Sequence, residues 1–136
     1  MTTVVAALLV AVLQAGLPMR PIDKGQDSEL DAGRQVMART VGEWSALWTQ
    51  HAGRRTRPNA EFSTEVVVGV FLGSRPSTGF GVEIVRVREE GVVLVVSYRE
   101  TRPAPGVVTA QILTSPYHVV AVPKGSTTDV KFERVN

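Results

Sequence analysis

Apolar residues in the second half of this chain alternate with polar ones at every other position, which is the pattern of half-buried β-strands. The strand-forming runs begin near Val66, recur about every ten residues up to Val135, and are interrupted by turns that contain glycine or proline. Valine dominates these runs, and its branched Cβ favours extended backbone. The pattern predicts a mainly β fold, α+β at the margin, with about six to seven strands in an antiparallel β-sandwich or barrel.

The expected strands differ in how their apolar residues are distributed. Residues 66–72 are apolar on both faces, which indicates a central strand. Residues 80–88 and 92–100 are predicted to form a hairpin, because the Glu89-Glu90-Gly91 turn contains a glycine that is free to take positive φ. Further strands are predicted at 35–39, 107–113, 117–122 and 130–135, and residues 19–22 suit a sheet edge.

Residues 40–51 carry a helical pattern. Thr40 suits the N-cap, Glu43 completes a capping box, and Gly53 ends the helix. The apolar side chains recur at helical spacing and form one stripe, which consists of Val41, Trp44, Leu47 and Trp48. We therefore predict one N-terminal amphipathic helix that packs on the sheet.

The helix and the residues after it also contain side chains that bind ligands in other proteins. The two tryptophans could stack on a sugar or a base, but their spacing favours docking onto the sheet. His51 lies in the last turn, where the helix dipole favours a charged imidazole, so we expect a capping role and not a ligand role. Arg54, Arg55 and Arg57 form a small basic cluster, which we expect in a solvated loop.

Composition and charge exclude several classes of function. With 136 residues, 43% of them apolar and 21% charged, the chain is long enough for one ordinary globular domain. The net charge is only +2, and basic residues are interleaved with acidic ones, so there is no basic stripe for nucleic acid. The absence of cysteine excludes disulfides, thiolate metal sites and cysteine nucleophiles.

The N-terminal residues form the longest apolar run. Residues 2–17 are uncharged and 4–13 are continuously apolar, which is too short for a transmembrane helix of about 20 residues. The run suits a signal peptide, so we predict export, with a signal peptide at 1–17 and a single β-rich domain at 18–136. A buried N-terminal strand or helix is the alternative. Leu17 stands where a lipoprotein would carry cysteine, so no stable membrane anchor is expected.

Residues 72–84 contain a glycine- and proline-rich turn between two strands. Pro76 fixes φ and Gly79 can take positive φ, which predicts a loop with a defined shape. Arg75 and Phe80 flank this turn and offer a cation and an aromatic ring for recognition. The alternative is a plain connection whose Phe80 turns into the core.

Catalytic patterns are weak. The chain has two histidines, and Ser115 lies close to His118, but no nucleophile elbow surrounds this serine and Pro116 suits a bend. The histidines are too far apart for zinc spacing, and no glycine-rich nucleotide motif occurs. We therefore predict a non-enzymatic protein without catalytic residues, metal or cofactor. A cryptic hydrolase would need His118 within hydrogen-bond reach of Ser115.

Several segments, in order along the chain, resemble one family. They are Ile22-Asp-Lys-Gly25-Gln-Asp-Ser28, Glu43-Trp44-Ser-Ala-Leu47-Trp48-Thr-Gln-His51, the run from Val67 to Ile84, Tyr98-Arg-Glu100-Thr-Arg-Pro103-Ala-Pro105-Gly106 and Leu113-Thr114-Ser115-Pro116-Tyr117-His118-Val119-Val120. From about Ile22 to Val135 the chain is similar to the C-terminal domain family of PrcB-type protease-complex subunits. The resemblance implies an exported, non-catalytic partner that supports or stabilises a protease assembly. The family usually has Gly-Gly-Tyr near Thr78-Gly79-Phe80-Gly81, so the aromatic ring is kept here and the phenol hydroxyl is lost.

Residues 75–80 are also remotely similar to the Thr-Gly-Tyr/Phe loop of chagasin-type cysteine-protease inhibitors. Those proteins wedge loops of an immunoglobulin-like sandwich into an active-site cleft. Their glycine-rich second loop is absent here, and Arg102-Pro103 lacks the aromatic residue that should follow.

We expect the function to be protein binding, with a protease or protease complex as partner and no nucleic acid. The surface would combine hydrogen bonds from the glycine-bearing turn, an aromatic anchor and charge pairing by arginine, provided by the loops 75–80, 102–106 and 115–118. The candidate residues are Arg75, Pro76, Ser77, Thr78, Gly79, Phe80, Arg102, Pro103, Ser115, Pro116, Tyr117 and His118. The alternatives are a chagasin-like inhibitor and a small-ligand-binding β module, which needs a concave apolar pocket beside these loops.

Overall fold

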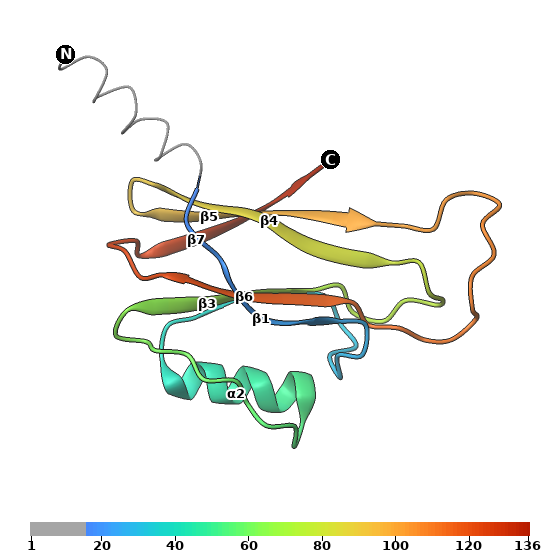
Figure 1. Cartoon of the computed structure of the whole chain (residues 1–136), viewed down its shortest axis with the longest axis horizontal. Helices are drawn as coiled ribbons and strands as arrows, with labels where there is room; N and C mark the ends of the chain where they lie inside the picture. Colours follow the sequence, from blue (N-terminus) through green and yellow to red (C-terminus); the bar gives the residue numbers. More distant parts are fainter. Residues whose placement is uncertain (1–15) are drawn as a thin grey trace, which may run out of the picture.

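The computed structural model describes residues 16–136, so the predicted signal peptide lies outside the described residues except for Gly16 and Leu17. Two β-sheets pack face to face, and one helix covers the outer face of the larger sheet (Figure 1). The predicted mainly β sandwich with one packed helix is confirmed. The two sheets stay separate over residues 16–136, so the fold is a sandwich and not a barrel.

The larger sheet has four strands in the order β1-β6-β3-β2, and every neighbouring pair is antiparallel. Its strands are β1 (Arg20–Gly25), β6 (Tyr117–Pro123), β3 (Glu65–Phe71) and β2 (Arg34–Ala38). The two-faced apolar run became β3, an inner strand that is buried on both sides. The segment expected at a sheet edge became β1, which is an edge strand.

The smaller sheet has three strands in the order β4-β5-β7, which are β4 (Gly81–Glu90), β5 (Val93–Thr101) and β7 (Asp129–Val135). Strands β4 and β5 form the predicted hairpin, and Gly91 in its turn has φ of 60°. Strands β5 and β7 are parallel, which corrects the expectation of a fully antiparallel fold. The cause is topological, because the chain visits the larger sheet as β6 between these two strands and returns in the same direction.

The strand predicted at residues 107–113 is wrong. Residues 102–116 form a long loop, in which only Thr114 and Ser115 make isolated bridges to other segments. Pro103 and Pro105 interrupt the backbone donors near its start, and the loop crosses from the smaller sheet to the larger one. Residues 107–113 therefore make no bridge to a strand of either sheet.

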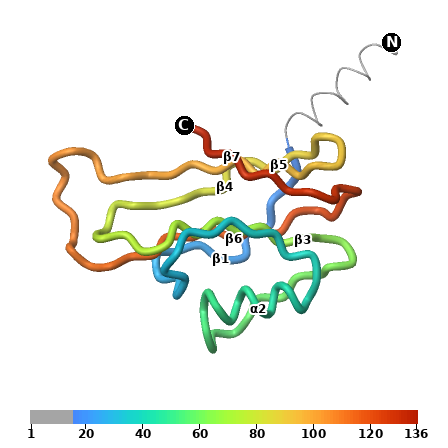
Figure 2. Tube along the Cα trace, turned by 180° about the vertical axis from the view of Figure 1, so that it is seen from behind, coloured from blue at the N-terminus to red at the C-terminus, as the bar shows by residue number. Residues whose placement is uncertain are grey.

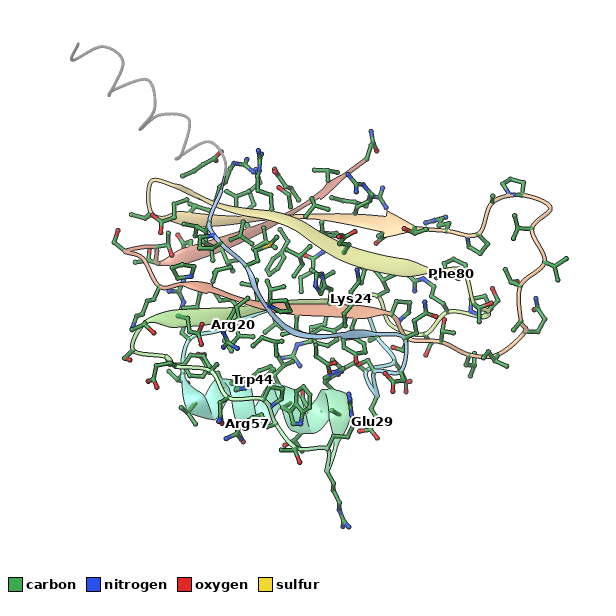
Figure 3. The ribbon with its side chains drawn as sticks, viewed as in Figure 1. Arg20, Lys24, Glu29, Trp44, Arg57 and Phe80 are labelled. Atoms are coloured by element: carbon green, nitrogen blue, oxygen red, sulfur yellow. The ribbon has the colours of Figure 1, made fainter. Side chains whose placement is uncertain are left out.

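Two apolar clusters hold the three layers together. The first lies between the sheets and is built from alternate residues of the inner faces, among them Val68, Val87 and Val96, each 0% exposed. The second lies between the larger sheet and the helix and contains Trp44 and Phe71. Figure 3 shows Trp44 between the helix and the sheet. The alternation of valines in the sequence thus separates the two faces of each strand.

Helix α2 (Val41–Ala52) begins with the predicted N-cap, since Thr40 Oγ1 accepts a hydrogen bond of 3.1 Å from the Glu43 backbone N–H. The Glu43 carboxylate accepts from the backbone N–H of Arg39, one residue before the position that a standard capping box uses. Gly53 ends the helix at φ of 60°. Among residues 16–136, no helix has the length and hydropathy to cross a membrane.

The apolar stripe of the helix is confirmed except for its first member. Both indole N–H groups donate to carbonyls of the segment after the helix, Trp44 to Pro58 at 2.9 Å and Trp48 to Arg55 at 2.7 Å. The tryptophans therefore dock the helix and are not free to stack on a ligand. Val41 is 58% exposed, because the contact with the sheet starts one turn later at Trp44.

Candidate docking surface

Two loops cross between the sheets at the same end of the sandwich (Figures 1 and 2). Residues 72–80 lead from β3 in the larger sheet to β4 in the smaller one, and residues 102–116 lead from β5 back to β6. We call this region the loop end. It contains almost all of the residues that the sequence predicted as a binding surface.

Hydrogen bonds join the two loops to each other. Arg75 and Thr114 exchange both backbone hydrogen bonds, at 2.7 and 3.0 Å, and Thr114 Oγ1 donates to the Ser77 carbonyl at 2.9 Å. Farther along, the Thr78 N–H donates to the Ala110 carbonyl at 3.1 Å, and the Ala110 N–H donates to Thr78 Oγ1 at 2.9 Å. The long loop is therefore pinned to the shorter one.

Gly79 allows the loops to approach each other closely. Its φ is +96°, a conformation that side chains disfavour, as the sequence predicted for this turn. A Cβ on Gly79 would lie 2.8 Å from Pro103 Cγ, so the position also lacks room for a side chain. Both constraints favour glycine at the point where the loops touch.

The predicted surface residues divide into three groups by exposure. Pro76, Gly79 and Arg102 are exposed, while Arg75, Thr78, Phe80, Pro103 and His118 are partly buried. Ser77, Ser115, Pro116 and Tyr117 are buried, and they therefore support the loop end from inside. Tyr117, proposed from the sequence as one of two aromatic anchors, is 2% exposed and packs between the sheet and the helix.

Phe80 lies where the shorter loop enters β4 (Figure 3) and belongs to neither apolar cluster. The Arg75 guanidinium lies 5.9 Å from the centre of the Phe80 ring, a cation–π arrangement. The same guanidinium donates to the carbonyls of Leu72 at 2.9 Å and Ser74 at 3.1 Å. Phe80 thus does not turn into the core, and it stays partly accessible beside a fixed cation.

The long loop carries the largest exposed apolar side chains of the loop end. We call them the apolar tip, and they are Val107 (57% exposed), Val108 (96%), Ile112 (59%) and Leu113 (81%). Sequence reasoning missed the tip because it assigned these residues to a strand. Two adjacent apolar pairs break the alternation, and no charged residue occurs from 103 to 123, which is the signal that could have found it.

The base of the long loop is fastened to the segment after β1. The Ser115 N–H donates to the Gln26 carbonyl at 2.8 Å, and the Ser28 N–H donates to the Ser115 carbonyl at 3.2 Å. The Ser115 hydroxyl donates to the Leu30 carbonyl at 2.8 Å. Ser115 is thus a structural anchor whose hydroxyl already has a partner.

His118 faces the space between the sheets. Its Nδ1 accepts a hydrogen bond of 2.8 Å from the Ile84 backbone N–H, so the imidazole bridges β6 and β4. Burial lowers the pKa of His118 below its ordinary value, Lys24 lowers it further, and Glu83 opposes the shift. Since His118 bonds Ile84 and Ser115 bonds Leu30, the arrangement that a hydrolase needs between Ser115 and His118 is not formed.

His51 is the second histidine, and its position differs from the predicted cap. The ring is 1% exposed, with Nδ1 2.8 Å from Ser28 Oγ and Nε2 3.1 Å from Asp23 Oδ2. Burial is the main cause that lowers the pKa of His51, and Asp23 opposes it. The residue types match a hydrolytic triad, but a substrate cannot reach a ring that lies edge-on at 4.2 Å from Tyr117.

Hollows near the loop end are small or polar. One of about 190 Å³ lies beside Lys24, Gln26, Glu83 and Thr101, and another of about 540 Å³ lies beside Glu100 and Arg102. The first is smaller than the 300–1,000 Å³ or so of ordinary ligand pockets, and the second is mostly lined by polar atoms. Residues 16–136 contain no group of three or more side chains of the types that hold a metal ion.

Residues 66–123, which run from the start of β3 to the end of β6 and include both loops, match the family model described as PrcB C-terminal. Over these residues the chain is similar to the PrcB C-terminal family. No curated protein and no solved structure matches the chain. The resemblance seen in the sequence is thereby confirmed over residues 66–123.

The PrcB C-terminal segment contains the whole loop end and both strands that His118 bridges. The segments 22–28 and 43–51, which also resemble the family, lie outside the match, so their resemblance stays a prediction. In the structure these two segments meet at His51 and Ser28 and support the base of the long loop.

Proposed function

We propose that the loop end docks onto another protein, and that the chain serves as an exported accessory or stabilising subunit of a protease complex. The observation that supports docking is the apolar tip, which is exposed although hydrogen bonds hold its loop in place. The match of residues 66–123 to the PrcB C-terminal family supports the protease complex. The uncharged apolar run at residues 4–13 supports export.

The apolar tip has the energetics of an interface anchor. Full burial of one valine or leucine side chain stabilises a complex by about 1.5–3 kcal/mol. Bonds from Thr78 and Thr114 already fix the loop, so docking costs little additional ordering entropy. Arg102 is exposed at the start of the same loop and provides a polar rim beside the apolar centre.

The absence of charge strengthens the case for a protein partner. The segment from Pro103 to Pro123 contains no aspartate, glutamate, lysine or arginine. Its one histidine, His118, faces the inside of the sandwich. An uncharged, apolar centre bounded by arginine is the composition of a protein interface, in which charged residues are depleted at the core.

Affinity capture from a native extract tests the proposal with a matched pair of variants. The double variant Val108→Asp/Leu113→Asp places two charges on the apolar tip. Val92→Asp places a charge on another exposed valine, 55% accessible, at the hairpin of the smaller sheet. We expect the unchanged protein and Val92→Asp to retain a peptidase subunit, and the tip variant to lose at least about tenfold of it, because a charge in an apolar interface costs more than ~1.4 kcal/mol.

All three proteins should unfold at the same denaturant concentration, since exposed substitutions change stability by no more than about 0.5 kcal/mol. Equal retention of the peptidase by the tip variant would contradict docking through the loop end. Inhibition of a purified papain-type cysteine protease by the unchanged protein would favour the chagasin-like alternative instead. Capture of proteins that are not associated with proteolysis would contradict the protease complex.

A further inference from the structure

The two sheets are joined by side-chain hydrogen bonds on both sides of one cross-section. In the larger sheet His118, Val70 and Gln35 are register neighbours, and in the smaller sheet Ile84 pairs with Tyr98. On one side the Ile84 N–H donates to His118 Nδ1 at 2.8 Å, and on the other Gln35 Nε2 donates to the Tyr98 hydroxyl at 2.7 Å. We call the bond between Ile84 and His118 the clasp.

The clasp lies directly beneath the loop end. His118 is the second residue of β6, just after the long loop, and Ile84 is close to the start of β4, just after the shorter loop. Each loop has one end in either sheet, so the spacing of the sheets here sets the distance that both loops must span. The bonds between Thr78 and Ala110 depend on that spacing.

The clasp requires a neutral imidazole. Nδ1 accepts from a backbone N–H, which is a donor in every protonation state, and the proton of neutral His118 is therefore on Nε2. Protonation would turn Nδ1 into a second donor facing the Ile84 N–H, and the bond would be lost. A backbone amide within a strand cannot rotate to avoid this conflict.

The charged groups around His118 come from two neighbouring strands. Lys24 of β1 opposes a positive imidazolium, whereas Glu83 of β4 favours it. Val70 of β3, the register neighbour on the other side, is buried and apolar. Burial and Lys24 outweigh Glu83, so the pKa of His118 lies below its ordinary value of about 6.5.

We propose that protonation of His118 opens the clasp and loosens the loop end, so that docking weakens in mildly acidic surroundings. The docking half rests on the proposed function, and the structural half does not. If only the neutral form holds the clasp, the closed fraction falls by at most about tenfold one pH unit below 6.5, and the apparent affinity falls with it.

Nuclear magnetic resonance on the ¹⁵N-labelled protein tests the structural half. We expect the Ile84 amide shift to titrate together with the His118 ring. The exchange protection of the Thr78 and Ala110 amides should fall, by at most about tenfold, between about pH 7.5 and 5.5, after correction for intrinsic rates. In His118→Asn, whose side-chain oxygen can accept from Ile84 without titrating, both changes should disappear.

His51→Gln is the second variant, and it removes the other titrating ring while leaving the clasp intact. The Ile84 titration should persist in it. The proposal would be overturned if the Ile84 amide shift did not change with the titration of His118, or if it changed only while His51 is present.

Affinity capture at about pH 7.5 and 5.5 tests the docking half, with the proteins that Val108→Asp/Leu113→Asp fails to retain as the probe. We expect weaker retention of them by the unchanged protein at the lower pH, by at most about tenfold, and no such loss for His118→Asn. Equal losses for both proteins would overturn the regulation. An Ile84 titration without tip-dependent retention at either pH would support the clasp and contradict the proposed function.

Discussion

At the scale of single residues, the two histidines show how burial converts a polar ring into a structural element. Each imidazole is held neutral by its position, His51 between Ser28 and Asp23, and His118 against the Ile84 amide. The sequence suggested a cap for His51, which is wrong, because a ring with two nitrogen atoms can satisfy buried partners from separate segments.

Truncation of His51 should destabilise the protein strongly. His51→Ala removes a ring that packs against Phe71 and Tyr117 and leaves Ser28 and Asp23 without their partner. We expect a loss of about 2–4 kcal/mol in the free energy of unfolding, measured by urea denaturation. Thr49→Ala, on the exposed face of the same helix, should change it by less than about 0.5 kcal/mol. A loss below about 1 kcal/mol for His51→Ala would contradict the buried network.

Acidification should destabilise the fold through its two histidines. Because burial lowers the pKa of both histidines, the unfolded chain binds more protons than the native one below about pH 6.5, and stability falls as the pH decreases. At about pH 5.5 each histidine can account for at most ~1.4 kcal/mol. Partners lower the pKa of Glu65 and Glu133, so their contribution is lost only below about pH 4.5.

Urea midpoints between about pH 7.5 and 5.5 measure this effect. The double variant His51→Gln/His118→Asn, which has no histidine left, should show a flat profile over that range. A profile of equal slope in the double variant would show that other groups carry the proton linkage.

At the scale of secondary structure, the alternation of apolar residues and the helix-capping residues predicted the elements that depend on local sequence. Seven strands and the helix correspond to runs that were visible in the sequence, apart from small shifts at their ends. Two predictions were wrong, and both concern features that depend on tertiary structure. The Val107–Leu113 run has strand-forming residues but crosses between sheets, and β5 pairs in parallel with β7 because of a topology that no local pattern encodes.

The sequence predicted the location of the candidate site but not which of its residues are accessible. Glycine and proline marked the shorter loop, and the structure confirms its shape at Gly79. Four of the candidate residues, Tyr117 among them, are buried, because they belong to the start of β6 or are covered by the opposite loop. The apolar tip replaces them as the accessible part, on a loop that pairs with the shorter loop.

Substitution of Gly79 should weaken the contact between the loops. Gly79→Ala adds both a disfavoured φ of +96° and a Cβ 2.8 Å from Pro103. Gly106→Ala is the matched control, since its φ is +81° and nothing lies within 4 Å of the added Cβ. We expect Gly79→Ala to lower the free energy of unfolding by about 1–3 kcal/mol more than the control, measured by thermal denaturation. Equal effects of the two variants would show that Pro103 can move away from the added Cβ without lowering the free energy of unfolding.

At the scale of the whole molecule, one end of the sandwich is built differently from the rest. The helix covers one outer face of the larger sheet and the sheets cover each other, whereas the loop end presents apolar side chains to water. Those side chains lie on the long loop, which is held in place by hydrogen bonds to the shorter loop. The clasp between the sheets lies next to both loops. The central claim is that this end contacts a protein of the protease complex.

Site-specific photo-crosslinking in a native extract tests that claim most directly. A photoreactive amino acid is placed at position 108, which is the most exposed residue of the apolar tip. In a control protein it is placed at position 92, where the replaced valine is also exposed. The account predicts that position 108 is linked to a peptidase subunit and position 92 is not. A link to the peptidase from position 92 alone, or from neither position while the complex is present, would contradict it.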